Sequence, residues 1–227
     1  ERRWTAKRKR ELIDSRINAT TALVDAVRTV PDHHRVFISA SGVSFYASGL
    51  EEALDESGPR GEGVLADMSA RWEEAARGAE PVSRLVILRF GVVMGPGGAL
   101  ARMYLPFKLG LGGRIAGGKQ WLSWIAREDV IRLIEWALMH DDVSGVYNGT
   151  SPHPVRNREF TRAVARALHR PAIIPIPAFA LKLLFGRMAE ETLLTGQRAV
   201  PGRATKNGFR FTLDTIESAT QHALRRR

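Results

Sequence analysis

Leu85-Val-Ile-Leu-Arg-Phe-Gly-Val-Val93 is the stretch that decides the fold class of this chain. It is apolar almost throughout, and polar and apolar positions do not alternate along it. Such a run is typical of a strand that helices bury on both faces of a parallel sheet. Gly95-Pro-Gly-Gly98 follows and predicts that the strand ends there.

The segments on either side of this run continue the pattern. Arg35-Val-Phe-Ile-Ser-Ala40 is a second short apolar run, and apolar spacing predicts a helix at about 64–77 between the two. Further helices are predicted at 5–30 and 129–140, and residues 145–148 are predicted to form a last short strand. Helices that alternate with buried strands predict an α/β fold built from parallel βαβ units.

The composition of the 227 residues is that of an ordinary globular protein, and it excludes several kinds of site. There is no cysteine, which excludes disulfides, thiolate metal ligands and cysteine nucleophiles. The six histidines show no spacing that places two imidazoles on one helical face, so no metal site is expected. No apolar run approaches the roughly 20 residues of a membrane span, so no membrane partner is expected.

The formal net charge is +10, and the basic residues gather at the two ends of the chain. They are Arg2, Arg3, Lys7, Arg8, Lys9 and Arg10 at the start and Arg225, Arg226 and Arg227 at the finish. Such clusters can bind nucleic acid, but no aromatic residues interleave with them as stacking platforms. We therefore interpret them as a solvated helix face and a tail, and keep RNA binding as a third hypothesis.

Short motifs along nearly the whole chain together resemble one family. They are Arg3-Trp4-Thr5 with Lys9 and Ser15-Arg16, Ile38-Ser-Ala-Ser41 with Phe45-Tyr46, Trp72-Glu73, Leu88-Arg89, Gly91-Val-Val-Met-Gly95, Leu105-Pro-Phe-Lys-Leu-Gly-Leu-Gly-Gly113, Trp121-Leu-Ser-Trp-Ile125, Gly145-Val-Tyr-Asn148, Gln197-Arg-Ala-Val-Pro201 and Gly208-Phe209. In this order and spacing they are similar to an atypical, epimerase-like branch of the extended short-chain dehydrogenases/reductases, in the NAD-dependent epimerase/dehydratase superfamily. That branch carries a C-terminal domain of unknown function.

The resemblance implies NADP as the cofactor. In that family a strand, a G-x-x-G-x-x-G turn and a helix hold the pyrophosphate, and we expect this glycine loop to be absent because nothing before Arg3 supplies it. Gly95 to Gly98 is interpreted as a loop, since Pro96 lacks the amide that a phosphate cradle would use. The glycine-rich residues 110–118 follow no predicted strand, and are also interpreted as a loop.

The resemblance also implies a division of the chain. Residues 1–150 are expected to be a partial NAD(P)-binding Rossmann domain, the C-terminal part of a parallel sheet without its first strands. Residues 151–227 are expected to form a small, mainly helical C-terminal lobe, with 96–125 contributing to the substrate cleft. A half sheet has an exposed edge, which we expect a homodimer or another partner to cover.

Catalysis in the superfamily uses a serine that orients the substrate and a tyrosine whose pKa is lowered by a lysine four residues further on. Ser41, at the carboxyl end of the strand 35–40, matches the serine, although without the resemblance a turn residue is an equal interpretation. Alignment on Trp72-Glu73 places Leu65 and Ser69 where the tyrosine and lysine belong. Neither side chain exchanges a proton at neutral pH.

Two other tyrosines are candidates for the missing acid. Tyr46 lies five residues after Ser41 and is predicted either to act as the acid in the same cleft or to form a wall of the pocket. Tyr104 and Lys108 have the right spacing, but Pro106 between them is expected to break a helix, so we interpret this pair as coincidental. The sequence therefore leaves open whether the protein is an enzyme.

The remaining candidates are binding residues. Ser39, Phe90, Gly91 and Val92 match strand ends beside the cofactor, with core packing as the alternative. Substrate binding is expected for Lys108, Arg114, Gln120, Trp121 and Trp124, with lobe packing as the alternative for the two tryptophans. Arg89 is expected to be a buried ion-pair partner, and Asp129 is expected to cap its helix by accepting backbone N–H bonds.

The first functional hypothesis is an NADP-linked epimerase or reductase-like protein that acts on a nucleotide sugar or a related carbonyl compound through transient hydride transfer. The missing tyrosine and lysine favour a rival, a non-catalytic cofactor-binding or scaffold protein with the same fold. RNA binding through the basic N-terminal helix is the third. The expected location is the cytoplasm, or the interior of an organelle if a targeting segment has been removed.

Overall fold

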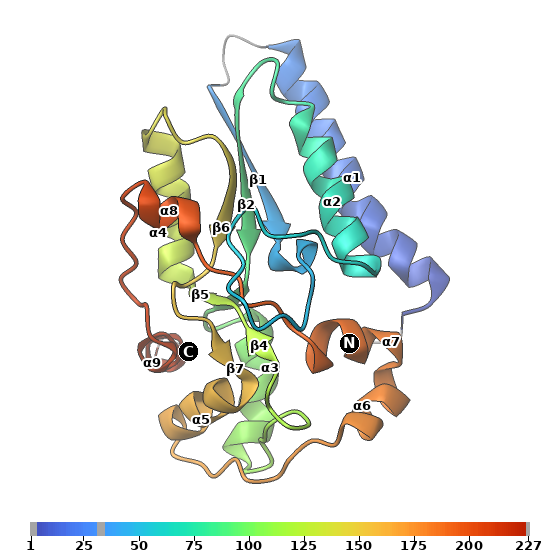
Figure 1. The fold of residues 1–227 in the computed structure, drawn as a ribbon, viewed down its shortest axis with the longest axis vertical. Coiled ribbons are helices and arrows are strands. Elements are labelled where there is room, and N and C mark those ends of the chain that lie inside the picture. Colours follow the sequence, from blue (N-terminus) through green and yellow to red (C-terminus); the bar gives the residue numbers. More distant parts are fainter. Residues whose placement is uncertain (1–3, 31–34, 226–227) are drawn as a thin grey trace.

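The computed structural model describes residues 4–30 and 35–225 (Figure 1). The basic residues Arg2, Arg3, Arg226 and Arg227 lie outside the described residues, as do His33 and His34. The elements are, in order, α1 (Ala6–Thr29), β1 (Val36–Gly42), the 3-10 helix η2 (Val43–Phe45), α2 (Val64–Arg77), β2 (Arg84–Phe90), β3 (Val92–Met94), α3 (Gly98–Lys108), β4 (Trp121–Leu122), β5 (Trp124–Ala126), α4 (Arg127–Met139), β6 (Gly145–Gly149), β7 (Val155–Arg156), α5 (Asn157–Ala167), α6 (Ala178–Phe185), α7 (Arg187–Ala189), the π-helix η3 (Glu190–Leu194), α8 (Gly202–Lys206) and α9 (Ile216–Arg225).

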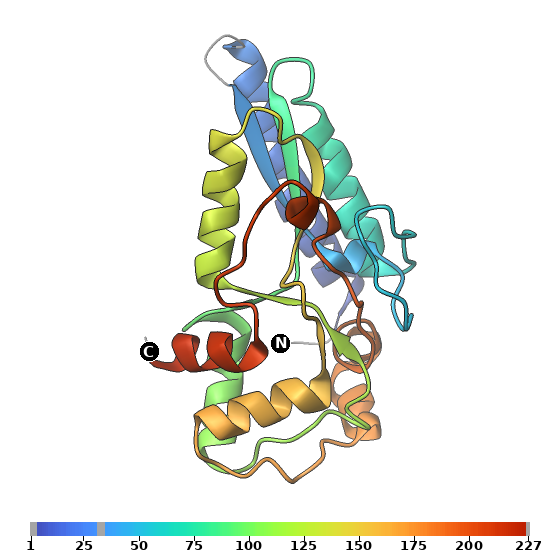
Figure 2. The ribbon, with the colours of Figure 1, turned by 60° about the vertical axis from the view of Figure 1, so that its left-hand side comes forward.

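A parallel sheet of three strands, in the order β1-β2-β6, forms the centre of the molecule. Helix α2 lies against one face of this sheet with α1 packed on α2, and α4 lies against the other face (Figure 1, Figure 2). The register places Ala40 of β1 beside Leu88 of β2, and Leu88 beside Tyr147 of β6. The predicted α/β class with a parallel sheet between helices is confirmed.

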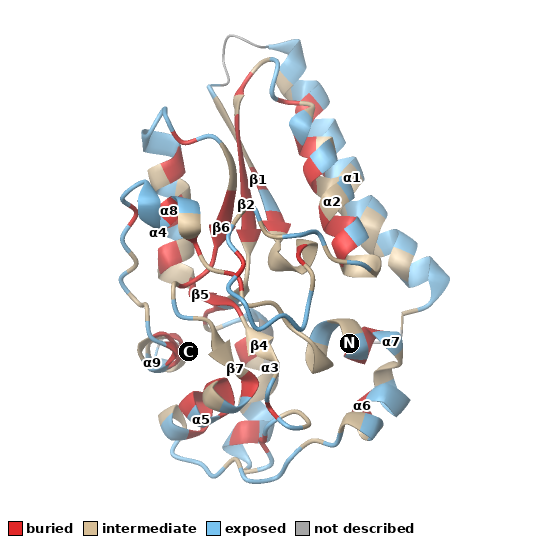
Figure 3. Ribbon diagram, in the orientation of Figure 1, coloured by how far each residue is buried: buried red, intermediate tan, exposed pale blue. Residues whose placement is uncertain are grey.

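Strand β2 is buried on both faces, as its apolar run predicts (Figure 3). Because successive side chains of a strand point to opposite faces, Leu85 and Ile87 pack with Ala76 of α2, whereas Val86 and Leu88 belong to the cluster on the α4 side. A strand between two helical layers has no solvent face. This is why the run shows no polar alternation.

The prediction of one continuous strand through Val93 is wrong, because the chain changes sheets at Gly91. The amide of Gly91 donates to Gly149 O of β6 at 3.1 Å, and the next amide, of Val92, donates to Ser123 O at 2.8 Å. Strand β3 then pairs with β5 in a separate two-stranded sheet. A Cβ at Gly91 would lie 2.5 Å from Ser123 O, so only glycine allows this close crossing.

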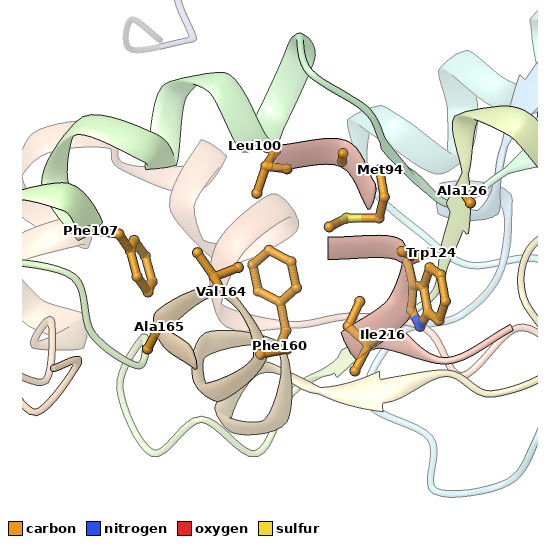
Figure 4. Packing of buried hydrophobic residues seen from close by; sticks show 12 residues of the cluster. Met94, Leu100, Phe107, Trp124, Ala126, Phe160, Val164, Ala165 and Ile216 are labelled. Atoms are coloured by element: carbon orange, nitrogen blue, oxygen red, sulfur yellow. The ribbon is translucent and has the colours of Figure 1, made fainter. Parts of the chain in front are cut away.

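A second apolar layer lies beyond the carboxyl ends of the three parallel strands. In Figure 4, Trp124 of β5 packs with Met94 of β3, Phe160 of α5 and Ile216 of α9. Phe107 and Leu100 extend this cluster along α3. We call this layer the lower lobe, and it is built from segments that lie far apart in the sequence.

Asp129 does not cap its own helix as expected. Helix α4 begins two residues earlier, at Arg127, and the Asp129 carboxylate accepts the amides of Thr212 and Leu213, both at 3.0 Å. It also accepts the Thr212 hydroxyl at 2.7 Å. A fully buried carboxylate thus ties the segment before α9 to the start of α4.

Two negative findings concern the described residues. None of their helices combines the length and the apolar character that crossing a bilayer requires. Within residues 4–30 and 35–225, no group of three or more histidine, aspartate or glutamate side chains is placed to hold a metal ion.

Candidate active site

The ends of β1 and β2 bring Ser41 and Arg89 side by side, and both bond to Glu73 of α2. The Ser41 hydroxyl donates to Glu73 Oε1 at 2.7 Å. Arg89 donates from Nε to Oε1 at 2.7 Å and from Nη2 to Oε2 at 2.8 Å. The side chains of Arg89 and Glu73 are 5% and 3% exposed, so the predicted buried ion pair of Arg89 is confirmed.

The guanidinium of Arg89 also packs on two aromatic rings that follow β1. Its central carbon lies 3.4 Å from the ring centre of Phe45 and 4.8 Å from that of Tyr46. Burial opposes the positive charge, but hydrogen bonds and charge from Glu73 outweigh it and raise the pKa of Arg89. One nitrogen, Nη1, is buried with no partner among the described residues.

Tyr46 is almost fully enclosed, and its hydroxyl donates to Asn148 Oδ1 of β6 at 2.8 Å. The Asn148 amide in turn donates to Val200 O at 2.9 Å. Burial raises the pKa of Tyr46, although the positive charge of Arg89 opposes the shift. At neutral pH the phenol keeps its proton and directs it at Asn148.

Helix α2 carries no proton-transfer pair at the positions where the resemblance places one. Ser69 is buried and shares a hydrogen bond of 3.0 Å with Ser44, and Leu65 is half-buried. Leu65, Ser44 and Tyr46, but not Ser69, line a hollow of about 180 Å³ near the strand ends, which we call the strand-end hollow. Three acidic residues also line this hollow, Glu62 and, from η3, Glu190 and Glu191.

The predicted cofactor residues lie around the junction of β1, β2 and β3. Ser39 is buried in β1, and its hydroxyl makes a long bond of 3.3 Å to the neighbouring Ala40 O. Phe90, Gly91 and Val92 form the crossing from β2 to β3. All four therefore lie at or near the carboxyl edge of the sheet, together with Ser41.

The predicted substrate residues do not form one group. Gln120 and Trp121 line a second hollow of about 330 Å³, the tryptophan hollow, whereas Lys108 and Arg114 are exposed and line neither hollow. Trp124 is fully buried in the lower cluster, and its indole N–H donates to His153 O at 3.0 Å. The structure thus separates the two tryptophans, which the sequence could not distinguish.

Two arginines pack on the ring of Trp121, which lines the tryptophan hollow. The guanidinium carbon of Arg156 is 3.7 Å from the Trp121 ring centre, and that of Arg198 is 4.5 Å away. Arg156 also bonds to the exposed carboxylate of Glu51, and this bond lowers the pKa of Glu51. The Gln120 amide donates to Leu193 O at 2.8 Å, which links this hollow to η3.

The expectation that Pro106 breaks a helix is wrong. Helix α3 continues through Pro106 to Lys108, and the Lys108 ammonium lies 5.6 Å from the ring centre of Tyr104. The helix ends two residues after Pro106, so the missing N–H and the ring of the proline affect only its last turns. The pair lies on α3, away from the residues of the strand-end hollow.

Two residues of this site were not predicted as functional, Glu73 and Asn148. Glu73 belongs to the Trp72-Glu73 motif, and Asn148 ends the motif Gly145 to Asn148. A charged or amide side chain next to a predicted buried segment was the available signal, because buried polar groups need partners. Their partners are 32 and 102 residues away in the chain, so spacing alone could not supply them.

Comparisons with known proteins agree with this geometry. Residues 1–148 match the model of the NAD dependent epimerase/dehydratase family, and residues 176–223 match a domain of unknown function, DUF1731. An epimerase family protein of Mycobacterium bovis is 40% identical over 228 residues, which cover 100% of this chain and 75% of that protein. An epimerase family protein of Bacillus subtilis, YfhF, is 39% identical over 96% of this chain and 72% of its own length.

Two solved structures share the fold over nearly the whole chain. The crystal structure of human epimerase family protein SDR39U1 with NADPH superposes with a TM-score of 0.94 at 34% identity, covering 99% of this chain and 77% of that one. A nucleoside-diphosphate sugar epimerase from Corynebacterium glutamicum superposes with a TM-score of 0.79 at 27% identity, covering 99% of this chain and 44% of that one.

Proposed function

Because this chain belongs to the NAD-dependent epimerase/dehydratase family, we propose that it binds NADP(H) at the carboxyl ends of β1, β2 and β6 and exchanges a hydride with a carbonyl compound or nucleotide sugar. The observation that carries the proposal is the group of buried polar side chains at these strand ends. Ligands of open α/β sheets bind at this edge. The NADPH in the structure of the human relative supports the choice of cofactor.

The residues present fit the nicotinamide end of this cofactor. Arg89 Nη1 is a buried donor without a described partner, and a carboxamide oxygen or a water molecule would satisfy it. Ser39, Phe90, Gly91 and Val92 would line the nicotinamide ribose. The pyrophosphate end has no cradle in residues 35–225, since none of the three parallel strands there leads through a glycine-rich turn directly into a helix. When bound, NADP(H) would supply or accept the hydride.

Ser41 and Tyr46 have limited roles in this proposal. The Ser41 proton is directed at Glu73, so the lone pairs of its oxygen remain to accept a hydrogen bond from a substrate hydroxyl. The Tyr46 proton is directed at Asn148, so the tyrosine forms the wall of the strand-end hollow. Neither side chain is placed to donate or accept the proton of the reaction. The substrate or a water molecule would have to supply or take up that proton.

A second function is favoured by the same contacts, cofactor binding without turnover. Leu65 and Ser69 stand where the family places its proton-transfer pair, and neither can take the part of a tyrosine or a lysine. General acid–base catalysis typically contributes about 10²- to 10⁴-fold in rate, so its loss reduces turnover strongly. A protein of this kind would hold the cofactor for sensing or for structure.

The test begins with NADPH binding to the full-length protein, expressed from its complete coding sequence and followed by nicotinamide fluorescence. Saturable binding is expected, and its absence would reject both functions. Turnover is then measured in two assays, oxidation of NADPH by a set of aldehydes and ketones, and interconversion of UDP-glucose and UDP-galactose in the presence of NADP+. Turnover with any of them supports the first function, whereas tight binding without turnover supports the second.

The serine at the strand end offers a matched pair of variants. Ser41→Ala removes the acceptor for the substrate hydroxyl, so we expect turnover to fall at least about tenfold while NADPH affinity stays the same. Ser57→Ala, at an exposed turn, should leave turnover unchanged. Equal turnover in both variants would show that Ser41 does not touch the substrate.

A further inference from the structure

A third hollow, larger and different in character, lies between α3 and α6, and we call it the apolar cavity. Its volume is about 660 Å³, within the usual range of about 300 to 1,000 Å³ for small-molecule sites. Apart from glycines and one proline, its walls are aliphatic, aromatic or thioether side chains. The principal ones are Met103, Phe107, Leu111, Ile115, Leu181 and Phe185.

The chemistry of these walls excludes a diphosphate and favours an apolar group. A diphosphate that enters the cavity would lose its hydration without gaining a cation or a hydrogen-bond donor from a lining side chain. An apolar group would leave water for a surface of the same kind, which is favourable. Lys108 and Arg114, which are exposed and close in sequence to the lining residues, do not line the cavity.

One turn of the chain connects the apolar cavity to the candidate active site. In the π-helix η3, Glu190 and Glu191 line the strand-end hollow, whereas Leu193 lines the apolar cavity. Leu194, next in the chain, lines the tryptophan hollow. π-Helical turns are rare and are frequently found at functional sites. A ligand in the cavity would therefore contact the same turn that walls the candidate active site.

We propose that the apolar cavity binds the apolar part of the substrate, an aromatic or alkyl group attached to the reacting carbonyl. The identification of this ligand as a substrate rests on the proposed function. The binding of an apolar group rests only on the cavity itself. The substrate class is thus an apolar aldehyde or ketone, and a nucleotide sugar would not use this cavity.

The probe is N-phenyl-1-naphthylamine, a neutral apolar fluorophore, titrated into the full-length protein without NADPH. We expect one saturable site, displacement by 2-naphthaldehyde and no displacement by UDP-glucose. Leu111→Glu places a carboxylate in the cavity wall and should weaken binding at least tenfold. Leu109→Glu is the matched control, since Leu109 and Leu111 are 63% and 60% exposed but only Leu111 lines the cavity.

Several results would overturn the inference. The first three are no saturable binding of the probe to the wild type, an equal loss of probe affinity in the two variants, and displacement of the probe by UDP-glucose. The fourth is a dimer that both variants dissociate, because a second copy of the chain would then cover this surface. Both positions are exposed, so the variants should fold, and circular dichroism checks this. NADPH affinity is measured on the same samples. Loss of NADPH binding with retained probe binding would reject the proposed function and leave the apolar site standing.

Discussion

Glu73 accepts three hydrogen bonds, one from Ser41 and two from Arg89, in a place that water does not reach. Removing one member of such a pair leaves the other charge buried and uncompensated. Glu73→Gln should therefore lower the free energy of unfolding by about 3–5 kcal/mol, measured by urea denaturation. The neighbouring Glu74 is exposed, and Glu74→Gln should change it by less than about 0.5 kcal/mol. Equal effects would mean that the buried pair is not formed in solution.

Tyr46 predicts a loss of stability at alkaline pH. Burial raises its pKa above the usual value of 10.0, so at high pH the unfolded chain releases the phenol proton while the folded protein retains it. The contribution of Tyr46 to the free energy of unfolding is complete below pH 10. It is lost as the pH rises through the higher pKa of the folded protein. The free energy of unfolding should fall between pH 8 and about pH 11. In Tyr46→Phe this decrease should be smaller, because the contribution of the Tyr46 phenol is removed. A slope that the variant leaves unchanged would assign it to other groups.

Single residues also mark how far the sequence could be interpreted. Arg89 was predicted as a buried ion-pair partner because a lone charge in an apolar strand needs a counter-charge. The identity of that counter-charge, Glu73, depends on how α2 packs on the sheet. Likewise, Asp129 was expected to bind the amides of its own helix, and in the structure it binds those of residues 212 and 213.

At the level of elements, Gly91 divides one predicted strand between two sheets. Gly91→Ala would place a Cβ 2.5 Å from Ser123 O, so we expect the backbone to shift and stability to fall by about 1–3 kcal/mol. At Gly97 a Cβ would meet nothing within 4 Å, and φ is −107°. Gly97→Ala should therefore be neutral or stabilising by up to about 1 kcal/mol. Thermal and urea unfolding of both variants measure the difference, and equal stabilities would contradict the crossing at Gly91.

The long and strongly periodic elements were predictable. The helix expected at 64–77 is α2, with the same bounds, and the strand expected at 35–40 is β1, shifted by one or two residues. The prediction was wrong for Pro106, where a local rule about helix breaking did not apply near the end of a helix. It was also wrong at Gly91, because no local pattern shows which sheet a strand will join.

At the scale of the whole molecule, the net charge of +10 is the main long-range property. Lys7, Arg8 and Arg10 are exposed at the start of α1, and no aromatic platform accompanies them within residues 6–29. We expect only non-specific RNA binding, with a dissociation constant of about 10⁻⁶ to 10⁻⁴ M at physiological salt. Fluorescence anisotropy with a single-stranded RNA 20-mer measures this affinity. In the double variant Arg8→Gln, Arg10→Gln the affinity should depend less steeply on the salt concentration. Nanomolar affinity that persists at high salt would restore RNA binding as a function.

The division of the molecule into a sheet and a lower lobe also has a functional consequence. The strand-end hollow, the tryptophan hollow and the apolar cavity are each lined by residues of the segment 190–196, together with residues from other parts of the chain. The sequence of this segment carries no recognised motif before Gln197. Its contacts with residues distant in the sequence make it a common wall.

The sequence by itself determined the fold class and the family, because apolar periodicity and short motifs are local properties that survive without knowledge of contacts. The prediction that Leu65 and Ser69 stand in place of the proton-transfer pair also came from the sequence, through the resemblance. The tertiary structure alone decided which polar side chains are hydrogen-bonded to one another. It also decided which tryptophan lines a hollow and which lies in the core, and it placed an apolar cavity beside the candidate active site. These features depend on contacts between residues tens to more than a hundred positions apart, and such contacts form only when the layers pack.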